Sequence, residues 1–297
     1  MDLRRSRWIL GVVLACFAIL CTPAGADEPN FTEEQKIDFL QHAKVIASKP
    51  EKKGKSDALH LTLSDGKVTY DASFQPIDER KIHGPGPHGG TELNFRDYWG
   101  YNIAGYRIAR LLGIDDMVPV YTERSWNGTK GAISWRVADV QFDEADRYNQ
   151  KIQPPDPDTW AKQMYKLRVM TQLFYDMDAN LTNVLITKDW KIWRIDFSRG
   201  FRLQHDLKDP KDLVQCDRQV LSKLRQLSYD QVFDATKPYL SKDEVKALIA
   251  RRDKMVAYFD KLIVQRARAR CFTKGALRAG GRGRIRQGSS LLHEALV

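Results

Sequence analysis

Two short apolar runs, separated by a polar turn, stand near the middle of the chain. The first covers Val184 to Thr187 and the second covers Lys191 to Ile195. Apolar runs of this length on either side of a polar turn predict a β-hairpin. Asp178 and Asn183 precede the first strand, and Asp196 follows the second. The hairpin would therefore bring these three oxygen-bearing side chains to one rim.

Hydrophobic periodicity predicts mainly strands before this hairpin and helices after it. The turns Asp65-Gly66 and Asn127-Gly128 each separate two strand-like runs, which indicates two further hairpins. The stretch 83–90, rich in Gly, Pro and His, is predicted to be a linker rather than a phosphate loop or a metal site. Apolar positions three and four residues apart predict helices over residues 32–46, 94–112, 158–175, 212–227, 228–240 and 241–269. This order of elements indicates an α+β fold.

The first 26 residues have the pattern of a secretory signal peptide. Three arginines lie within the first seven residues, residues 8–21 are apolar, and Ala24-Gly25-Ala26 is a small-residue cleavage site. Because the apolar run is short for a membrane span, we expect cleavage and a secreted or periplasmic protein. Two alternatives are lipid attachment at Cys16 and an uncleaved anchor.

The composition indicates a packed core, since 42% of the residues are hydrophobic and seven are Trp. We expect a small lobe over residues 27–140 and a large helical lobe over 141–272. Once the leader is removed, Cys216 and Cys271 remain. An oxidising compartment would allow these two residues to pair, but their spacing alone does not establish a disulfide, and we expect free thiols.

The net charge of +10 is concentrated near the C-terminus. Residues 251–286 contain twelve Lys or Arg against two acidic residues, so the rest of the chain is neutral overall. We interpret residues 273–297 as a disordered basic tail. Such a tail can contact an anionic envelope surface without specificity or can serve solubility alone. We expect no specific nucleic-acid binding.

The three polar side chains at the predicted rim have the chemistry of phosphoryl transfer. One aspartate can accept the proton of an attacking hydroxyl, while an asparagine and a second aspartate supply hard oxygen ligands to a divalent cation. The alternative is a surface hairpin in which Asp and Asn residues only form turns.

This segment resembles the atypical members of the kinase-like superfamily: phosphatidylinositol 3- and 4-kinases, HipA-type kinases and secreted Golgi protein kinases. The run from Asp178 to Asn183 resembles their D-R-[HN]-x-x-N loop more than the H-R-D form, and Asp196-Phe197-Ser198 stands in the place of D-F-G. The resemblance implies a bilobal kinase-like fold that binds ATP or another nucleotide. It makes Asp178 the catalytic residue and makes Asn183 and Asp196 the ligands of Mg²⁺ or Mn²⁺.

The sequence departs from this family pattern in the small lobe. Gln75 stands where a strand lysine would bind the nucleotide phosphates, and Asn102 stands where a helical glutamate would pair with that lysine. We expect these two amides to form a neutral pair and, with Asn180, to lie at the nucleotide. Lys81 and Glu92 are spare candidates for the missing charged roles.

Two further segments have open interpretations. Trp135 and Val137 lie where backbone groups of a hinge would meet an adenine edge, although a plain connecting strand fits equally well. Arg199 and Arg202 follow the metal aspartate closely. They could pair with Asp196, hold a phosphate, or take part in a salt-bridged surface.

Taken together, these residues predict an extracytoplasmic kinase-like phosphotransferase that uses a nucleotide and a divalent metal. Two alternatives stay open. One is a nucleotide-binding pseudokinase that acts as an envelope interaction module, which the loss of the charged pair favours. The other is a nucleotidyl transferase on the same fold. The acceptor could be a protein, a lipid or a small molecule.

Overall fold

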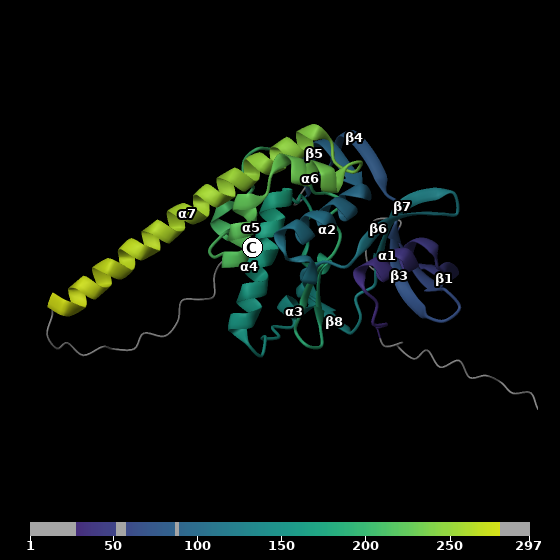
Figure 1. The fold of residues 1–297 in the computed structure, drawn as a ribbon, viewed down its shortest axis with the longest axis horizontal. Coiled ribbons are helices and arrows are strands. Elements are labelled where there is room, and N and C mark those ends of the chain that lie inside the picture. Colours follow the sequence, from purple (N-terminus) through teal and green to yellow (C-terminus); the bar gives the residue numbers. More distant parts are fainter. Residues whose placement is uncertain (1–27, 52–57, 87–88, 280–297) are drawn as a thin grey trace, which may run out of the picture.

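The computed structural model describes residues 28–51, 58–86 and 89–279, with side chains through residue 267. The predicted leader and residues 280–297 of the predicted tail lie outside these ranges. Strands dominate the first half of the described chain and helices dominate the second half, as Figure 1 shows. The predicted α+β fold, with a small β-rich lobe and a helical lobe, is therefore confirmed.

The small lobe is built on a five-stranded antiparallel sheet with the strand order β1-β2-β3-β7-β6. Both predicted hairpin turns occur in it. The strands are β1 (Lys44–Pro50), β2 (Leu59–Ser64), β3 (Thr69–Gln75), β6 (Tyr121–Trp126) and β7 (Thr129–Trp135). Helix α1 (Glu33–His42) covers one face of the sheet, and Thr32 caps the helix in a capping box with Gln35.

The alternation of side chains along β3 fixes which residues face the rest of the molecule. Ala72 and Phe74 pack beneath α1 in a separate apolar cluster. Ser73 and Gln75 must then point to the opposite face, because successive side chains in a strand alternate between faces. Gln75, the last residue of β3, is in this way directed toward the helical lobe.

Two expectations for the small lobe are wrong. The first predicted helix ends at His42, and residues 44–50 form the edge strand β1. Residues 83–90 are not a plain linker, because β4 (Asp78–Pro85) and β5 (Thr91–Tyr98) form a separate two-stranded sheet. The second predicted helix therefore begins at Gly100 rather than at residue 94. Phe95 is buried against Gly84, where an added Cβ would lie 2.2 Å from the Phe95 ring.

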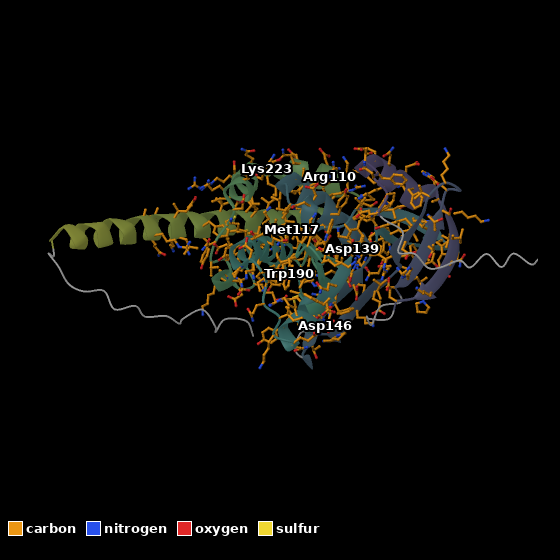
Figure 2. All side chains as sticks on the ribbon, turned by 90° about the horizontal axis from the view of Figure 1, so that it is seen from below. Arg110, Met117, Asp139, Asp146, Trp190 and Lys223 are labelled. Carbon is orange, nitrogen blue, oxygen red and sulfur yellow. The ribbon has the colours of Figure 1, made fainter. Side chains whose placement is uncertain are left out.

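The helical lobe packs around one large core that also includes the buried face of α2 (Gly100–Leu112). Gly113 ends α2 in the left-handed conformation, with φ of 67°, as its position predicted. Figure 2 views the molecule from below and shows side chains filling the space between the elements. Met117 is buried in this interior. The remaining helices are α3 (Glu144–Asn149), α4 (Pro157–Phe174), α5 (Arg218–Gln226), α6 (Tyr229–Thr236) and α7 (Lys242–Ala279).

Helix α7 continues beyond the boundary at residue 272 that composition predicted. It runs to Ala279, and its far end projects away from the body (Figure 1). The Arg, Ala, Lys and Leu residues of this segment have high helix propensity, which accounts for the extension. Across residues 28–51, 58–86 and 89–279, no helix combines the length and the apolar character that crossing a membrane requires.

The hairpin that carries the candidate chemistry is present as predicted. Strands β9 (Val184–Thr187) and β10 (Ile192–Arg194) pair antiparallel, and β8 (Val140–Asp143) completes a three-stranded sheet in the order β10-β9-β8. Helix α4 supports the loop before the hairpin. Its cap is Asp156, with Pro157 at the first helical position.

Candidate active site

Asp196 follows β10 directly and has an unusual backbone conformation. Its φ of 58° lies in the left-handed region, which non-glycine residues occupy at a cost and often at functional sites. The Asp196 amide donates a hydrogen bond to the Tyr121 hydroxyl at 3.4 Å, and the Ser198 amide donates to Asp196 Oδ1 at 3.1 Å. These contacts hold the carboxylate on the side of the helical lobe that faces the small lobe.

The two amides that replace the expected ion pair are in contact. Asn102 Nδ2 donates to Gln75 Oε1, and Asn102 Oδ1 accepts from the Phe197 amide at 2.6 Å. Gln75 Nε2 in turn lies 3.4 and 3.5 Å from the two carboxylate oxygens of Asp196. Asn102 is fully buried, so its two hydrogen bonds are made without competition from water. A continuous chain of amide hydrogen bonds thus joins β3, α2 and the segment after β10.

Asn183 and Asp178 lie on the other side of the hairpin opening from Asp196. The Asn183 carbonyl accepts a hydrogen bond from the Ile195 amide at 3.0 Å, which places Asn183 opposite the residue before Asp196. Loss of hydration raises the pKa of Asp178, and the nearby charges of Asp176 and Asp196 raise it further, while Arg199 and Arg194 lower it. The Asp196 carboxylate is thus close enough to Asp178 to raise the pKa of that residue.

Arg194 holds this loop together, and the sequence analysis did not single it out. Its guanidinium donates a hydrogen bond to the Asp176 carboxylate. It also donates to three backbone carbonyls: that of Ile195, that of Asn183 at 3.2 Å and that of Asp178 at 3.5 Å. Arg194 and Asp176 side chains are each only 2% exposed. The signal was available, because Arg194 shares the buried face of its strand with Ile192.

Asn180, the third residue predicted to contact the nucleotide, caps the short turn Leu181–Asn183. Its side chain accepts a hydrogen bond from the Thr182 amide at 3.0 Å and is exposed. A nucleotide contact by Asn180 stays a prediction.

The two spare candidates for the missing charged pair do not meet. Glu92 is buried and accepts hydrogen bonds from both Arg199 and Arg202, whereas Lys81 pairs with Glu79 at 2.6 Å on the surface. Among the interpretations of the two arginines, the structure therefore supports salt bridges, with Glu92 as the shared partner. These bridges anchor the β4–β5 hairpin to the segment after Asp196.

Asp97 is a second carboxylate near Asp196 that the sequence analysis missed. Burial raises the pKa of Asp97, the charge of Asp196 raises it further, and a hydrogen bond with Ser198 opposes the shift. Its Oδ1 atom is buried and has no hydrogen-bond partner in the described structure. Asp97 was overlooked because residues 94–112 were predicted as one helix, whereas residues 91–98 form β5.

These side chains fit a divalent cation that keeps part of its own hydration. No group of three or more His, Cys, Asp or Glu within residues 28–51, 58–86 and 89–279 has the spacing of a metal cage. Mg²⁺, however, is usually bound by one or two carboxylates, with water and substrate phosphates completing its coordination. Asp196 is one such carboxylate, and the role of Asn183 as a second oxygen ligand stays a prediction. The unpaired Oδ1 of Asp97 gives the region a further acceptor for a cation or its water.

No protein-family model matches the chain, and no curated protein matches its sequence. Comparison with solved structures does find similar folds. The structure of hydra Fam20 with sugar matches with a TM-score of 0.57 and 14% sequence identity, over 78% of this chain and 89% of that chain. The chain has a kinase-like fold. The Helicobacter pylori proinflammatory kinase CtkA matches with a TM-score of 0.46 and 10% identity, over 74% of this chain and 96% of that chain.

Proposed function

We propose that the protein is a phosphotransferase that uses a nucleotide and a divalent cation. The observation that carries the proposal is the position of Asp196, in strained backbone, between the amide pair of the small lobe and the Asp178 loop. A carboxylate held in this way is suited to bind a cation that bridges nucleotide phosphates. A plain surface turn would not need the buried contacts of Arg194 and Asn102.

Asp178 would act on the acceptor. In the transfer step, an acceptor hydroxyl oxygen bonds to the terminal phosphorus, the bond from that phosphorus to the leaving diphosphate breaks, and the hydroxyl proton passes to Asp178. The raised pKa of Asp178 favours this role, because proton transfer is easier to a more basic carboxylate. Asn183 and Asp196 would hold the cation, which supplies positive charge to the phosphates when bound.

A non-catalytic nucleotide-binding module is the second candidate function. It is favoured by the neutral pair of Gln75 and Asn102, which leaves the phosphates without the cation that a strand lysine provides. Both candidates predict nucleotide binding. They differ in whether the terminal phosphoryl group is transferred from the nucleotide to an acceptor.

The proposal also includes the cellular location of the protein and the class of its acceptor. The leader pattern supports a secreted or periplasmic location, and the basic residues after Arg251 support a loose contact with an anionic envelope. Because the hydra Fam20 structure was solved with sugar, sugars are the first acceptor class to test here, followed by proteins and lipids.

The test is a thermal-shift titration of the mature chain with ATP and other nucleotides, in Mg²⁺ or Mn²⁺ and in EDTA. We expect a metal-dependent stabilisation that Asp196→Asn abolishes. Asp234→Asn is the matched control, because Asp234 of α6 is exposed and forms an exposed ion pair with Lys237, the residue after that helix. A shift that survives in Asp196→Asn would contradict the assigned metal ligand.

Mass spectrometry of the protein and of added acceptors then separates the alternatives. Added phosphate supports the phosphotransferase, and an added nucleotidyl group identifies the other transferase. Nucleotide binding without any mass change supports the module. If no nucleotide shifts the melting temperature with either metal, both candidate functions are refuted.

A further inference from the structure

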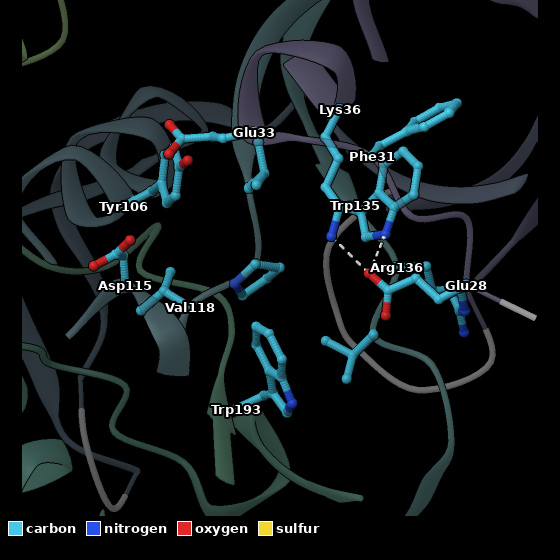
Figure 3. A pocket seen from close by; sticks show the side chains of 13 residues that line it. Glu28, Phe31, Glu33, Lys36, Tyr106, Asp115, Val118, Trp135, Arg136 and Trp193 are labelled. Atoms are coloured by element: carbon cyan, nitrogen blue, oxygen red, sulfur yellow. Dashed lines mark hydrogen bonds and ion pairs between the residues drawn. The ribbon is translucent and has the colours of Figure 1, made fainter. Parts of the chain in front are cut away.

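A cavity lies outside the candidate active site. Its volume is about 200 Å³, and its walls come from the segment around α1, from α2, from the strand end at Trp135 and from Trp193 of β10. Figure 3 shows these side chains around the opening. Asp178, Asn183 and Asp196 are not among its lining residues. The walls come from both lobes. Helices α1 and α2 belong to the predicted small lobe, and β10 belongs to the hairpin of the predicted large lobe that carries the candidate site.

One end of this cavity has oxygen atoms that can still accept hydrogen bonds from a ligand. Tyr106 is 3% exposed, and its hydroxyl makes no hydrogen bond of ordinary length and angle within the described structure, so it keeps capacity to accept one from a ligand. Burial raises the pKa of Tyr106 most, a hydrogen-bonding interaction with the Glu33 side chain raises it further, and the charges of Glu33 and Asp115 add to the shift, so both carboxylates lie near the hydroxyl. Glu33 is neutralised by Arg110 at 2.7 Å. The described residues provide no ion pair for Asp115.

The other end of the cavity contains cations, but each has a carboxylate partner. Lys36 pairs with Glu28 at 2.6 Å, and Glu28 also accepts from Trp135 Nε1 at 3.0 Å. Arg136 pairs with Glu51 at 2.6 Å. Among the described lining residues, the Asp115 carboxylate is therefore the charge that is left without compensation.

We propose that this cavity binds a small organic cation, an alkylammonium or alkylguanidinium. Its N–H groups would donate to the Asp115 carboxylate and to the Tyr106 hydroxyl, and its carbon chain would contact the aromatic walls. The Trp193 ring already attracts one ammonium group, since Lys191 Nζ lies 4.2 Å from its centroid. A volume of about 200 Å³ corresponds to roughly seven water molecules, which matches a linear ligand of about seven heavy atoms.

The test is a calorimetric and thermal-shift titration of the mature chain with 1,4-diaminobutane and with n-butylguanidine. Butane-1,4-diol serves as the uncharged ligand of similar shape. We expect saturable binding of the two cations and none of the diol. Asp115→Asn should weaken binding by about tenfold or more, because a charge-assisted hydrogen bond is lost. Tyr106→Phe should weaken it by roughly three- to tenfold, because only a neutral acceptor is removed.

Asp116→Asn is the matched control, since Asp116 is the exposed neighbour of Asp115 in the same short turn and does not line the cavity. It should bind the cations as the wild type does. Tyr106→Phe should also fold normally, because the buried hydroxyl that it removes makes no hydrogen bond of ordinary geometry in the described structure. The proposal is overturned if neither cation binds saturably below about 10 mM, if the diol binds equally well, or if Asp115→Asn and Asp116→Asn behave alike. It does not depend on phosphoryl transfer, so loss of one proposal leaves the other intact.

Discussion

The buried pair of Arg194 and Asp176 provides the sharpest test of how the candidate site is held. Asp176→Asn removes the negative charge and the oxygen that accepts from Arg194, whereas the remaining amide oxygen can still accept the hydrogen bond that the Asp178 amide donates at 3.0 Å. Arg194 would then be buried, at 2% exposure, without its counter-charge. Removing one partner of a buried pair costs about 3–5 kcal/mol. For a domain of this size, that is a fall in melting temperature of roughly 6–20 °C.

Thermal and urea denaturation of the wild type, Asp176→Asn, Arg194→Met and the double variant would measure this effect. The double variant should lose much less than the sum of the two single variants, since neither residual charge stays buried. Asp260→Asn is the control, because Asp260 and Arg225 are both about half exposed and such pairs contribute about 0–1 kcal/mol. The reasoning is refuted if Asp176→Asn loses no more stability than Asp260→Asn, or if the two single effects simply add.

Two further substitutions test other buried polar groups of the site. Asn102→Leu should lower the free energy of unfolding by about 2–4 kcal/mol in urea denaturation, because it removes the hydrogen bond from Asn102 Nδ2 to Gln75 Oε1 and takes the acceptor away from the buried Phe197 amide; an effect as small as that of the exposed change Asn149→Leu would contradict this. Asp97→Asn should raise the melting temperature at neutral pH, because burial raises the pKa of Asp97 in the folded state and its charged form destabilises the fold. The folded-state pKa lies above the ordinary value of 3.8, so this gain should disappear as the pH falls below the folded pKa, and a loss of stability at neutral pH would contradict the sign.

The hairpin at 184–194 could be predicted from sequence because its signal is local. Two apolar runs and a polar turn define it completely, and its pairing fixes where Asn183 and Asp196 lie. The contact between Gln75 and Asn102 was expected only through the family resemblance. Nothing in the spacing of residues 75 and 102 requires it, since it depends on how α2 packs against β3.

Residues that act through non-local pairing were missed. Asp97 lies in β5, a strand stabilised by pairing with β4 rather than by its own pattern, so the helix period beginning nearby was extended too far. Arg194 was passed over because an arginine in a short strand is most simply exposed. Its burial is favourable only because Asp176 and several carbonyls converge on it, and that convergence comes from the tertiary fold.

The amide pair separates two roles that a lysine–glutamate pair would combine. Gln75 and Asn102 position the segment after β10, since together they contact the Phe197 amide and the Asp196 carboxylate. They supply no net charge. The positive charge that acts on both Asp178 and Asp97 comes instead from Arg199, which lowers the pKa of each. Arg199 is itself bound to Glu92 of the β4–β5 hairpin. The small-lobe sheet and α2 thus position the segment after β10. The positive charge comes from the Arg199 guanidinium of the large lobe, which is anchored to the β4–β5 hairpin through Glu92.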